Sequence, residues 1–265
     1  KYKFLLCKKE KKYYTLYYKM NDDLIDLVYP CHKKDTETLV LAIQYAKKNI
    51  KNLRNIYVVS KTKLTDDAIW IGEDIFPFTF QDMIDKIGNH FRTGWNYAGW
   101  IHLHSAMYIP GILDNVLICD ADTFFIKPVV FIENGISLFN ISFSDGTALY
   151  FEHMTKLLNI PPQIKPPMSG VCHHILINKT ILKSMMDHVE KKFNKPFWQA
   201  WIDVTLEKYN SCLPKFENMD NKHRGPGRAT SYELYFNYAL KFFPDKVKIR
   251  KLRSILSYKE FLNVK

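Results

Sequence analysis

One segment, residues 114–128, constrains the fold of this chain more than any other. Its apolar run at residues 116–119 follows Asp114-Asn115 and leads into Asp120-Ala121-Asp122. A run of this kind, with β-branched residues and a proline soon after it, is typical of a strand covered on both faces in an α/β sheet. Open sheets of that class bind ligands beyond the carboxyl ends of their strands. The sequence therefore predicts two carboxylates at a ligand-binding edge.

The elements before this segment alternate in type. A first central strand is expected over 24–30, a helix over 36–46 after a cap at Asp35 or Thr36, and a second buried strand over 55–60. A β-α-β unit of this length is the unit of a parallel sheet. Downstream, we expect short strand-like pieces at 70–73 and 75–78, strands at 137–142 and 173–177, and helices at 80–87, 99–109, 150–158, 179–193, 198–209 and 231–242.

Length and composition favour one soluble α/β domain over residues 1–265. Within it we expect an N-terminal arm or edge strand at 1–23, a nucleotide-binding half at 24–130 and an acceptor-side half at 131–265. No apolar run approaches the ~20 residues of a membrane span. The five cysteines form no C-x-x-C pair, which favours reduced thiols and a cytoplasmic location. Because the first residue is Lys1, a fragment of a longer polypeptide is also expected.

The formal net charge is +11, carried mainly by lysines spread along the chain. Nucleic-acid-binding proteins usually concentrate arginine on one surface, so no nucleic-acid partner is expected. The excess charge would still attract an anionic substrate such as a nucleotide diphosphate.

Asp120 and Asp122 predict a divalent cation. Carboxylates separated by one residue can share a hard cation, and such a cation is the usual means of holding a pyrophosphate. Oxygen ligands suit Mn²⁺ or Mg²⁺. The alternative is that both aspartates cap a turn.

The segments Gly99-Trp100, Tyr150-Phe151-Glu152-His153-Met154, His173-His174-Ile175-Leu176 and Ser231-Tyr232-Glu233-Leu234-Tyr235 accompany the D-x-D. Together with it, over roughly residues 24–245, they resemble nucleotide-sugar-dependent glycosyltransferases of the GT-A fold. The resemblance is to a poorly characterised family in bacteria and large DNA viruses. It implies a Rossmann-like, mixed but mostly parallel sheet flanked by helices, a UDP-sugar donor, and a glycan, protein or small-molecule acceptor.

The resemblance also implies site residues. Asp122 would ligate the metal, for which the family favours manganese, while Asp120, beside Ala121, would hold the ribose or the metal through water. His223 is the candidate third ligand, although the Gly-Pro-rich loop that carries it could equally be a mobile lid whose Arg224 and Arg228 clamp phosphate.

Base and ribose would lie near residues at the ends of the first two strands, with an ordinary turn as the alternative: Tyr29, Pro30, Cys31, His32 and, more weakly, Ser60. The chain departs from the family pattern after Trp100, where Leu103-His104 and Met107 replace a Gln-Gln pair and a lysine. His104 could substitute for a glutamine or be a structural histidine.

An inverting transferase needs a carboxylate base for the acceptor hydroxyl. Glu233 is the first choice and Asp203 the second, although Glu233 could be an ordinary first-turn charge after a Thr230 or Ser231 cap. His173 and His174 alternate across a strand, so at most one of them faces the cleft and binds the acceptor.

Two other functions are compatible with these motifs. Asp120-x-Asp122-x-Thr is similar to the opening motif of haloacid-dehalogenase-type phosphatases, in which the first aspartate is a nucleophile. The charge and the altered helix after Trp100 would also suit an inactive, basic binding domain. The donor sugar, the acceptor, the stereochemical outcome and the oligomeric state are not fixed by these patterns.

Overall fold

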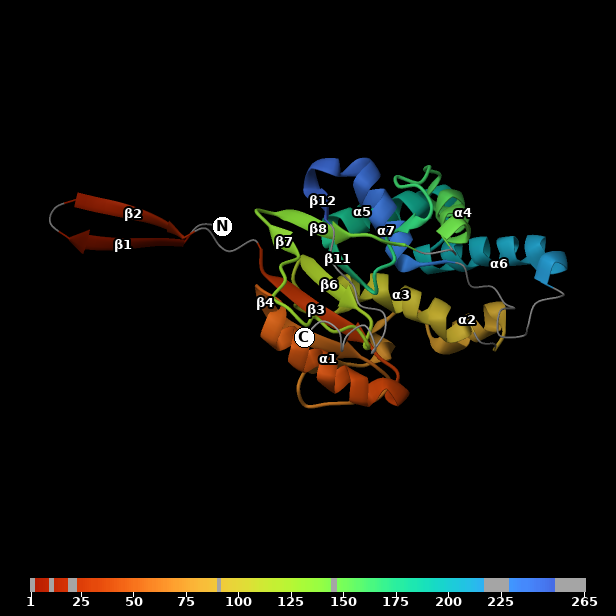
Figure 1. Ribbon diagram of the computed structural model, residues 1–265, viewed down its shortest axis with the longest axis horizontal. Helices are drawn as coiled ribbons and strands as arrows, with labels where there is room; N and C mark the ends of the chain where they lie inside the picture. Colours follow the sequence, from red (N-terminus) through yellow and green to blue (C-terminus); the bar gives the residue numbers. More distant parts are fainter. Residues whose placement is uncertain are drawn as a thin grey trace.

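The computed structural model describes residues 3–9, 12–18, 23–89, 92–143, 147–216 and 229–250. Its centre is a five-stranded sheet in the order β11-β6-β3-β4-β5 (Figure 1). Four strands are parallel to one another: β3 (Ile25–Pro30), β4 (Leu53–Val59), β5 (Ile69–Ile71) and β6 (Asn115–Cys119). β11 (His174–Asn178) pairs antiparallel with β6. The predicted mixed, mostly parallel α/β fold is confirmed.

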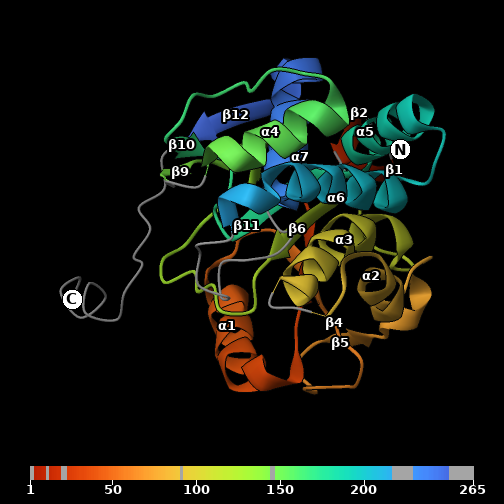
Figure 2. The same cartoon turned by 90° about the vertical axis from the view of Figure 1, so that its right-hand side faces the viewer.

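Helices cover both faces of this sheet. α1 (Thr36–Asn49) packs on one face, while α2 (Phe80–Ile87), α3 (Thr93–Tyr108), α5 (Lys179–Phe193) and α7 (Ser231–Phe242) belong to the core on the other (Figures 1 and 2). α4 (Thr147–Leu158) and α6 (Phe197–Phe216) extend that second core. Successive side chains of β3 point to opposite faces of the sheet: Leu27 packs in the core on the α1 side and Val28 in the core on the other side. The continuous apolar pattern of this strand follows from burial on both faces.

Smaller sheets complete the architecture. β12 (Val247–Arg250), β8 (Ile136–Asn140) and β7 (Ile132–Glu133) form one, and β9 (Ser142–Phe143) pairs with β10 (Met168–Ser169). β1 (Lys3–Lys9) and β2 (Lys12–Tyr18) make a separate antiparallel pair within the predicted N-terminal arm. Because β11 pairs with β6, one sheet joins the two predicted halves of the chain.

Several details differ from the sequence prediction. α3 begins at Thr93 rather than at Gly99. The predicted strand at 75–78 is absent from this described segment, where η2 (Glu73–Ile75) makes a 3-10 turn and Phe76 and Phe78 stack within the core. Core packing of these two rings, rather than pairing in a sheet, accounts for the apolar residues. β12 was not predicted.

No helix among the described residues combines the length and the apolar character that crossing a bilayer requires.

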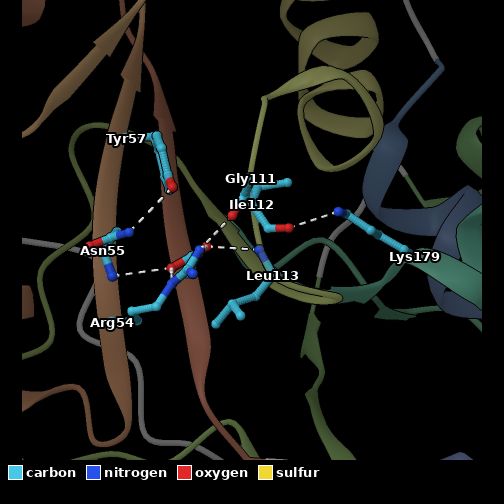
Figure 3. Close-up of polar contacts among 8 residues, drawn as sticks. Arg54, Asn55, Tyr57, Gly111, Ile112, Leu113 and Lys179 are labelled. Atoms are coloured by element: carbon cyan, nitrogen blue, oxygen red, sulfur yellow. Dashed lines mark hydrogen bonds and ion pairs between the residues drawn. The ribbon is translucent and has the colours of Figure 1, made fainter.

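A buried carboxylate fixes the amino-terminal end of the sheet. Asp26 on β3 is fully buried, and its Oδ1 accepts hydrogen bonds from Arg54 Nε at 2.9 Å and from the Asn55 amide at 3.1 Å on β4. Its Oδ2 accepts from the Leu113 amide at 2.9 Å, just before β6. Figure 3 shows Arg54 reaching on to the Gly111 carbonyl, 2.8 Å away. One side chain thus connects three neighbouring strands.

Nearby, Lys179 at the start of α5 donates from its ammonium to the Ile112 carbonyl at 2.8 Å (Figure 3). Its amide donates to the Asp114 carbonyl at 2.9 Å. The segment that leads into β6 is therefore held from two sides.

We expect Asp26→Asn to lower the free energy of unfolding by about 3 kcal/mol, because it removes the charge of the fully buried partner of the ion pair with Arg54. Urea unfolding measures the change. Asp67→Asn is the matched control, since Asp67 pairs with Lys47 on the surface, where both side chains are about half exposed. Equal losses in the two variants would contradict the assignment of Asp26 as the anchor of the sheet.

Candidate active site

The acidic pair lies in a pocket at the carboxyl ends of β3 and β6. The pocket has a volume of about 340 Å³ and is lined by residues from the end of β3, η1 (Lys33–Asp35), α3, the segment after β6, the segment before β11, and the start of α7. Asp120, Ala121 and Asp122 all contribute to it. The structure thus brings the D-x-D to the ligand-binding edge that the sequence predicted.

Asp120 is held from two other elements. Tyr232 on α7 donates its hydroxyl to Oδ1 at 2.6 Å, and His173 Nδ1 lies 2.8 Å from Oδ2. The Asp120 amide also donates to the His173 carbonyl at 2.9 Å. Burial alone would raise the pKa of the Asp120 carboxyl, but the hydrogen bond with His173, the nearby His102 and the hydrogen bond from Tyr232 lower it below its usual value. Asp120 is therefore an ionised, oriented group.

Asp122 differs from Asp120 because its residue is exposed. No hydrogen bond or ion pair of its carboxylate is found among the described residues. It is thus available to a ligand, whereas both oxygens of Asp120 already accept hydrogen bonds.

The described wall of the pocket is acidic although the chain is basic. Among the described residues that line it are three aspartates, Asp35, Asp120 and Asp122, and one lysine, Lys34, while the hydrogen bond with Asp120 raises the pKa of His173. Within the part of the chain that the structure describes, no three His, Cys, Asp or Glu side chains form a group that could hold a metal. A cation held by one or two carboxylates, with substrate phosphates and water completing its shell, is however the common arrangement for Mg²⁺. The two aspartates fit that kind of site.

His102, rather than His104, is the histidine of α3 that faces the pocket. Its Nε2 lies 3.7 Å from Asp120 Oδ1 and its Nδ1 lies 2.9 Å from Ser231 Oγ. Burial lowers its pKa. Trp95, Ala98, Gly99 and His102 line the pocket at the spacing of one helical face. Counting from Gly99 by helical period would have found His102, which the sequence analysis missed.

His104 lies on another face of α3 and does not line this pocket. It is 3% exposed, its Nδ1 lies 2.7 Å from the Trp100 carbonyl, and its ring packs against Phe78 and Phe197. Burial lowers the pKa of His104 to about 4. The structure therefore supports the structural alternative for this histidine.

Three successive residues of α7 tie different walls of the pocket together. Ser231 contacts His102 on α3, Tyr232 contacts Asp120 after β6, and Glu233 contacts the segment before β11. Glu233 is fully buried, and its carboxylate accepts hydrogen bonds from the Ser169 hydroxyl, the Gly170 amide at 3.0 Å and Asn237 Nδ2 at 2.9 Å. Burial raises its pKa.

This enclosure places Glu233 off the pocket wall, which does not favour its predicted role as the acceptor base. It instead positions the segment that carries Val171 and His173 into the pocket. Gly170 is required there, because an added Cβ would lie 2.6 Å from Phe236 Cγ. His173 adopts a φ of 59° and its side chain is 58% exposed, whereas the His174 ring packs against Phe125 and Phe131. Of the two histidines, His173 lines the pocket and His174 does not, in agreement with the expectation that at most one of them faces the cleft.

At the end of β3 only part of the predicted segment lines the pocket. Pro30 does, but Tyr29 is buried with its hydroxyl 3.4 Å from the Ala42 carbonyl, and Cys31 is buried beside it. His32 caps η1 by accepting a hydrogen bond from the Lys34 amide at 3.2 Å. The pocket is instead reached by Lys34 and Asp35, one turn later; the sequence analysis named Asp35 only as a possible helix cap and did not name Lys34.

The remaining predicted residues lie elsewhere. Ser60 is buried and donates to the Thr62 carbonyl at 2.8 Å. Asp203 on α6 pairs with Lys195 at 2.6 Å and does not line the pocket. His223, Arg224 and Arg228 lie outside the described residues, so their roles stay predictions.

No protein-family model matches the chain, and no curated protein does. Among solved structures, mouse xyloside xylosyltransferase 1 in its apo form aligns over 86% of this chain and 85% of its own, with 12% identity and a TM-score of 0.42. The Saccharomyces cerevisiae mannosyltransferase Ktr4p aligns over 85% of this chain and 68% of its own, with 11% identity and a TM-score of 0.46. Likenesses at this level do not assign a family.

The low pKa of His104 predicts acid sensitivity. Because the unfolded chain binds a proton at this histidine near pH 6.5 and the folded chain only near pH 4, its contribution to stability is complete above pH 6.5 and is lost as the pH falls toward 4. Between pH 7 and pH 5 this one group should lower the free energy of unfolding by about 2 kcal/mol. Urea unfolding of wild type and His104→Gln measures it. An equally steep loss of stability in the variant would contradict the assignment.

Proposed function

We propose that the protein is a metal-dependent glycosyltransferase that moves a sugar from a nucleotide diphosphate donor to an acceptor hydroxyl.

 The donor is taken to be UDP-linked, as the sequence resemblance implies. The observation that carries the proposal is the position of Asp120 and Asp122 in one pocket at the carboxyl ends of β3 and β6. Pockets at this edge of an open α/β sheet are the usual ligand sites of such folds.

The charge of the pocket supports a role for a cation. A nucleotide diphosphate is an anion, and three aspartates on the wall would repel it. A divalent cation at the D-x-D would reverse that repulsion and, when bound, would stabilise the negative charge that develops on the leaving diphosphate. Mn²⁺ or Mg²⁺ would suit these oxygen ligands.

The two aspartates would have different roles. Asp122, whose carboxylate is exposed, would hold the cation directly. Asp120 would bind the cation through water or bind the ribose, because each of its carboxylate oxygens already has a hydrogen bond, one with Tyr232 and one with His173. His223 stays the proposed third ligand. Pro30 and Lys34, which line the pocket, would contact the donor's base and ribose, and His173 would contact the acceptor.

The structure gives no support to the phosphatase alternative. Asp120 follows the fourth strand of the parallel set in chain order, after β3, β4 and β5, and both of its oxygens accept hydrogen bonds rather than facing the pocket as a free nucleophile. Hydrolysis of p-nitrophenyl phosphate that depends on Asp120 would reverse this choice.

The decisive variant is Asp122→Asn, which keeps the shape of the side chain and removes its charge. With Mn²⁺ present, its Kd for UDP should rise at least about tenfold, because a carboxylate ligand of the cation is lost, while weak metal-free binding of UDP should not fall. Isothermal titration calorimetry measures both.

Asp187→Asn serves as the control, since Asp187 forms an exposed pair with Lys183 on α5. The same protein should hydrolyse or transfer sugar from at least one member of a panel of nucleotide sugars in a Mn²⁺-dependent manner. UDP affinity that is unchanged in Asp122→Asn with Mn²⁺ present would exclude the proposed role of the D-x-D.

A further inference from the structure

The start of α7 forms a second polar wall of the pocket, in addition to the D-x-D. Ala229, Thr230, Ser231 and Tyr232 all line the pocket. As at any helix start, the first amides of α7 have no acceptor within the helix, and among the described residues no acceptor is found for the amides of Ser231, Tyr232 and Glu233. Such amides and the helix dipole favour a negative charge.

Thr230 adds a second, independent feature. It is the N-cap residue of α7, with an extended backbone at φ −141° and ψ 130°, and it is only 4% exposed. An N-cap threonine normally accepts a hydrogen bond from an amide in the first turn, but the Thr230 side chain makes no such bond. Its hydroxyl also has no other partner among the residues that the structure describes. Because Thr230 lines the pocket, a ligand or water there can bond to this hydroxyl.

The neighbouring side chains are already committed to the protein. Ser231 contacts His102, and Tyr232 donates to Asp120, which keeps these groups from capping the helix. The Thr230 hydroxyl and the first amides of α7 are thus the free donors on this wall of the pocket, as far as the described residues show.

We propose that the Thr230 hydroxyl and the amides at the start of α7 form a binding subsite for the diphosphate group of a nucleoside diphosphate. The subsite rests on the proposed function for the identity of the ligand, but it is separate from the cation at the D-x-D. It supplies hydrogen-bond donors to the anion where the side chains of the pocket are mainly carboxylates. The hydroxyl and amides are oriented before the ligand arrives, because α7 is fixed through Ser231, Tyr232 and Glu233.

The test compares Thr230→Val, which keeps the shape and removes the hydroxyl, with Thr230→Ser, which keeps the hydroxyl. Binding of inorganic pyrophosphate is followed by ³¹P NMR titration in EDTA, so that no metal contributes. Binding of UDP and of uridine is followed by calorimetry with Mn²⁺.

We expect Thr230→Val to weaken pyrophosphate and UDP by about tenfold, the effect of one hydrogen bond to a charged group, and to leave uridine unchanged. Thr230→Ser should bind all three ligands like wild type. The ligand-free Val variant should unfold at the same urea concentration as the Ser variant, because no cap bond is lost.

Three outcomes would overturn the subsite: no binding of pyrophosphate to the wild type, equal binding to wild type and Thr230→Val, or a lower urea midpoint of ligand-free Thr230→Val, which would assign the hydroxyl to capping. Failure of the proposed function gives a different result. In that case no nucleotide sugar is turned over and Asp122→Asn has no effect, whereas pyrophosphate binding that depends on Thr230 still supports the subsite.

Discussion

The buried carboxylate of Asp26 is the interaction on which the arrangement of the sheet depends. A buried carboxylate is stable only when its oxygens accept hydrogen bonds. Here the donors are Arg54 and Asn55 on β4 and Leu113 in the segment before β6. Those bonds fix the register of three adjacent strands at their starting ends. The register at the start of each strand also determines where its carboxyl end lies. It therefore sets the positions of Pro30, at the end of β3, and Asp120, after β6, in the pocket.

At the opposite end of the sheet, α7 takes over the role of connecting segments. Its first turn contacts α3 through Ser231, the segment after β6 through Tyr232, and the segment before β11 through Glu233. These segments are distant in the sequence but form one wall of the pocket. A change at the start of α7 therefore alters the aspartate, the histidines and the amides of the site together, so single substitutions there should not be read as independent effects.

The electrostatics of the pocket differ from those of the whole chain. The formal charge of +11 suits attraction of an anion over a distance, but among the described residues the pocket wall carries three aspartates and one lysine. An anionic substrate would thus be drawn to the protein by its surface and held in the pocket only with help from a cation or from backbone donors. The proposed cation site at Asp122 and the proposed subsite at Thr230 supply these two kinds of help.

The sequence by itself determined most of the strands and helices and the position of the acidic pair. The apolar run at residues 116–119 and the helical period of residues 36–46 can both be recognised from neighbouring residues alone, because each reflects which face of the element is buried. The prediction failed at residues 75–78, where Phe76 and Phe78 are apolar because they pack in the core and not because they form a strand. A short apolar pattern does not distinguish the two.

Only the tertiary structure decided which polar side chains reach the pocket. His102 and His104 differ by two positions on α3, yet that rotation turns one toward Asp120 and the other into the core. Glu233 has the sequence context of a catalytic or surface charge, but Ser169, Gly170 and Asn237 enclose it. The physical reason is that local patterns encode burial and helical period, whereas the partner of a polar group is set by segments far away along the chain.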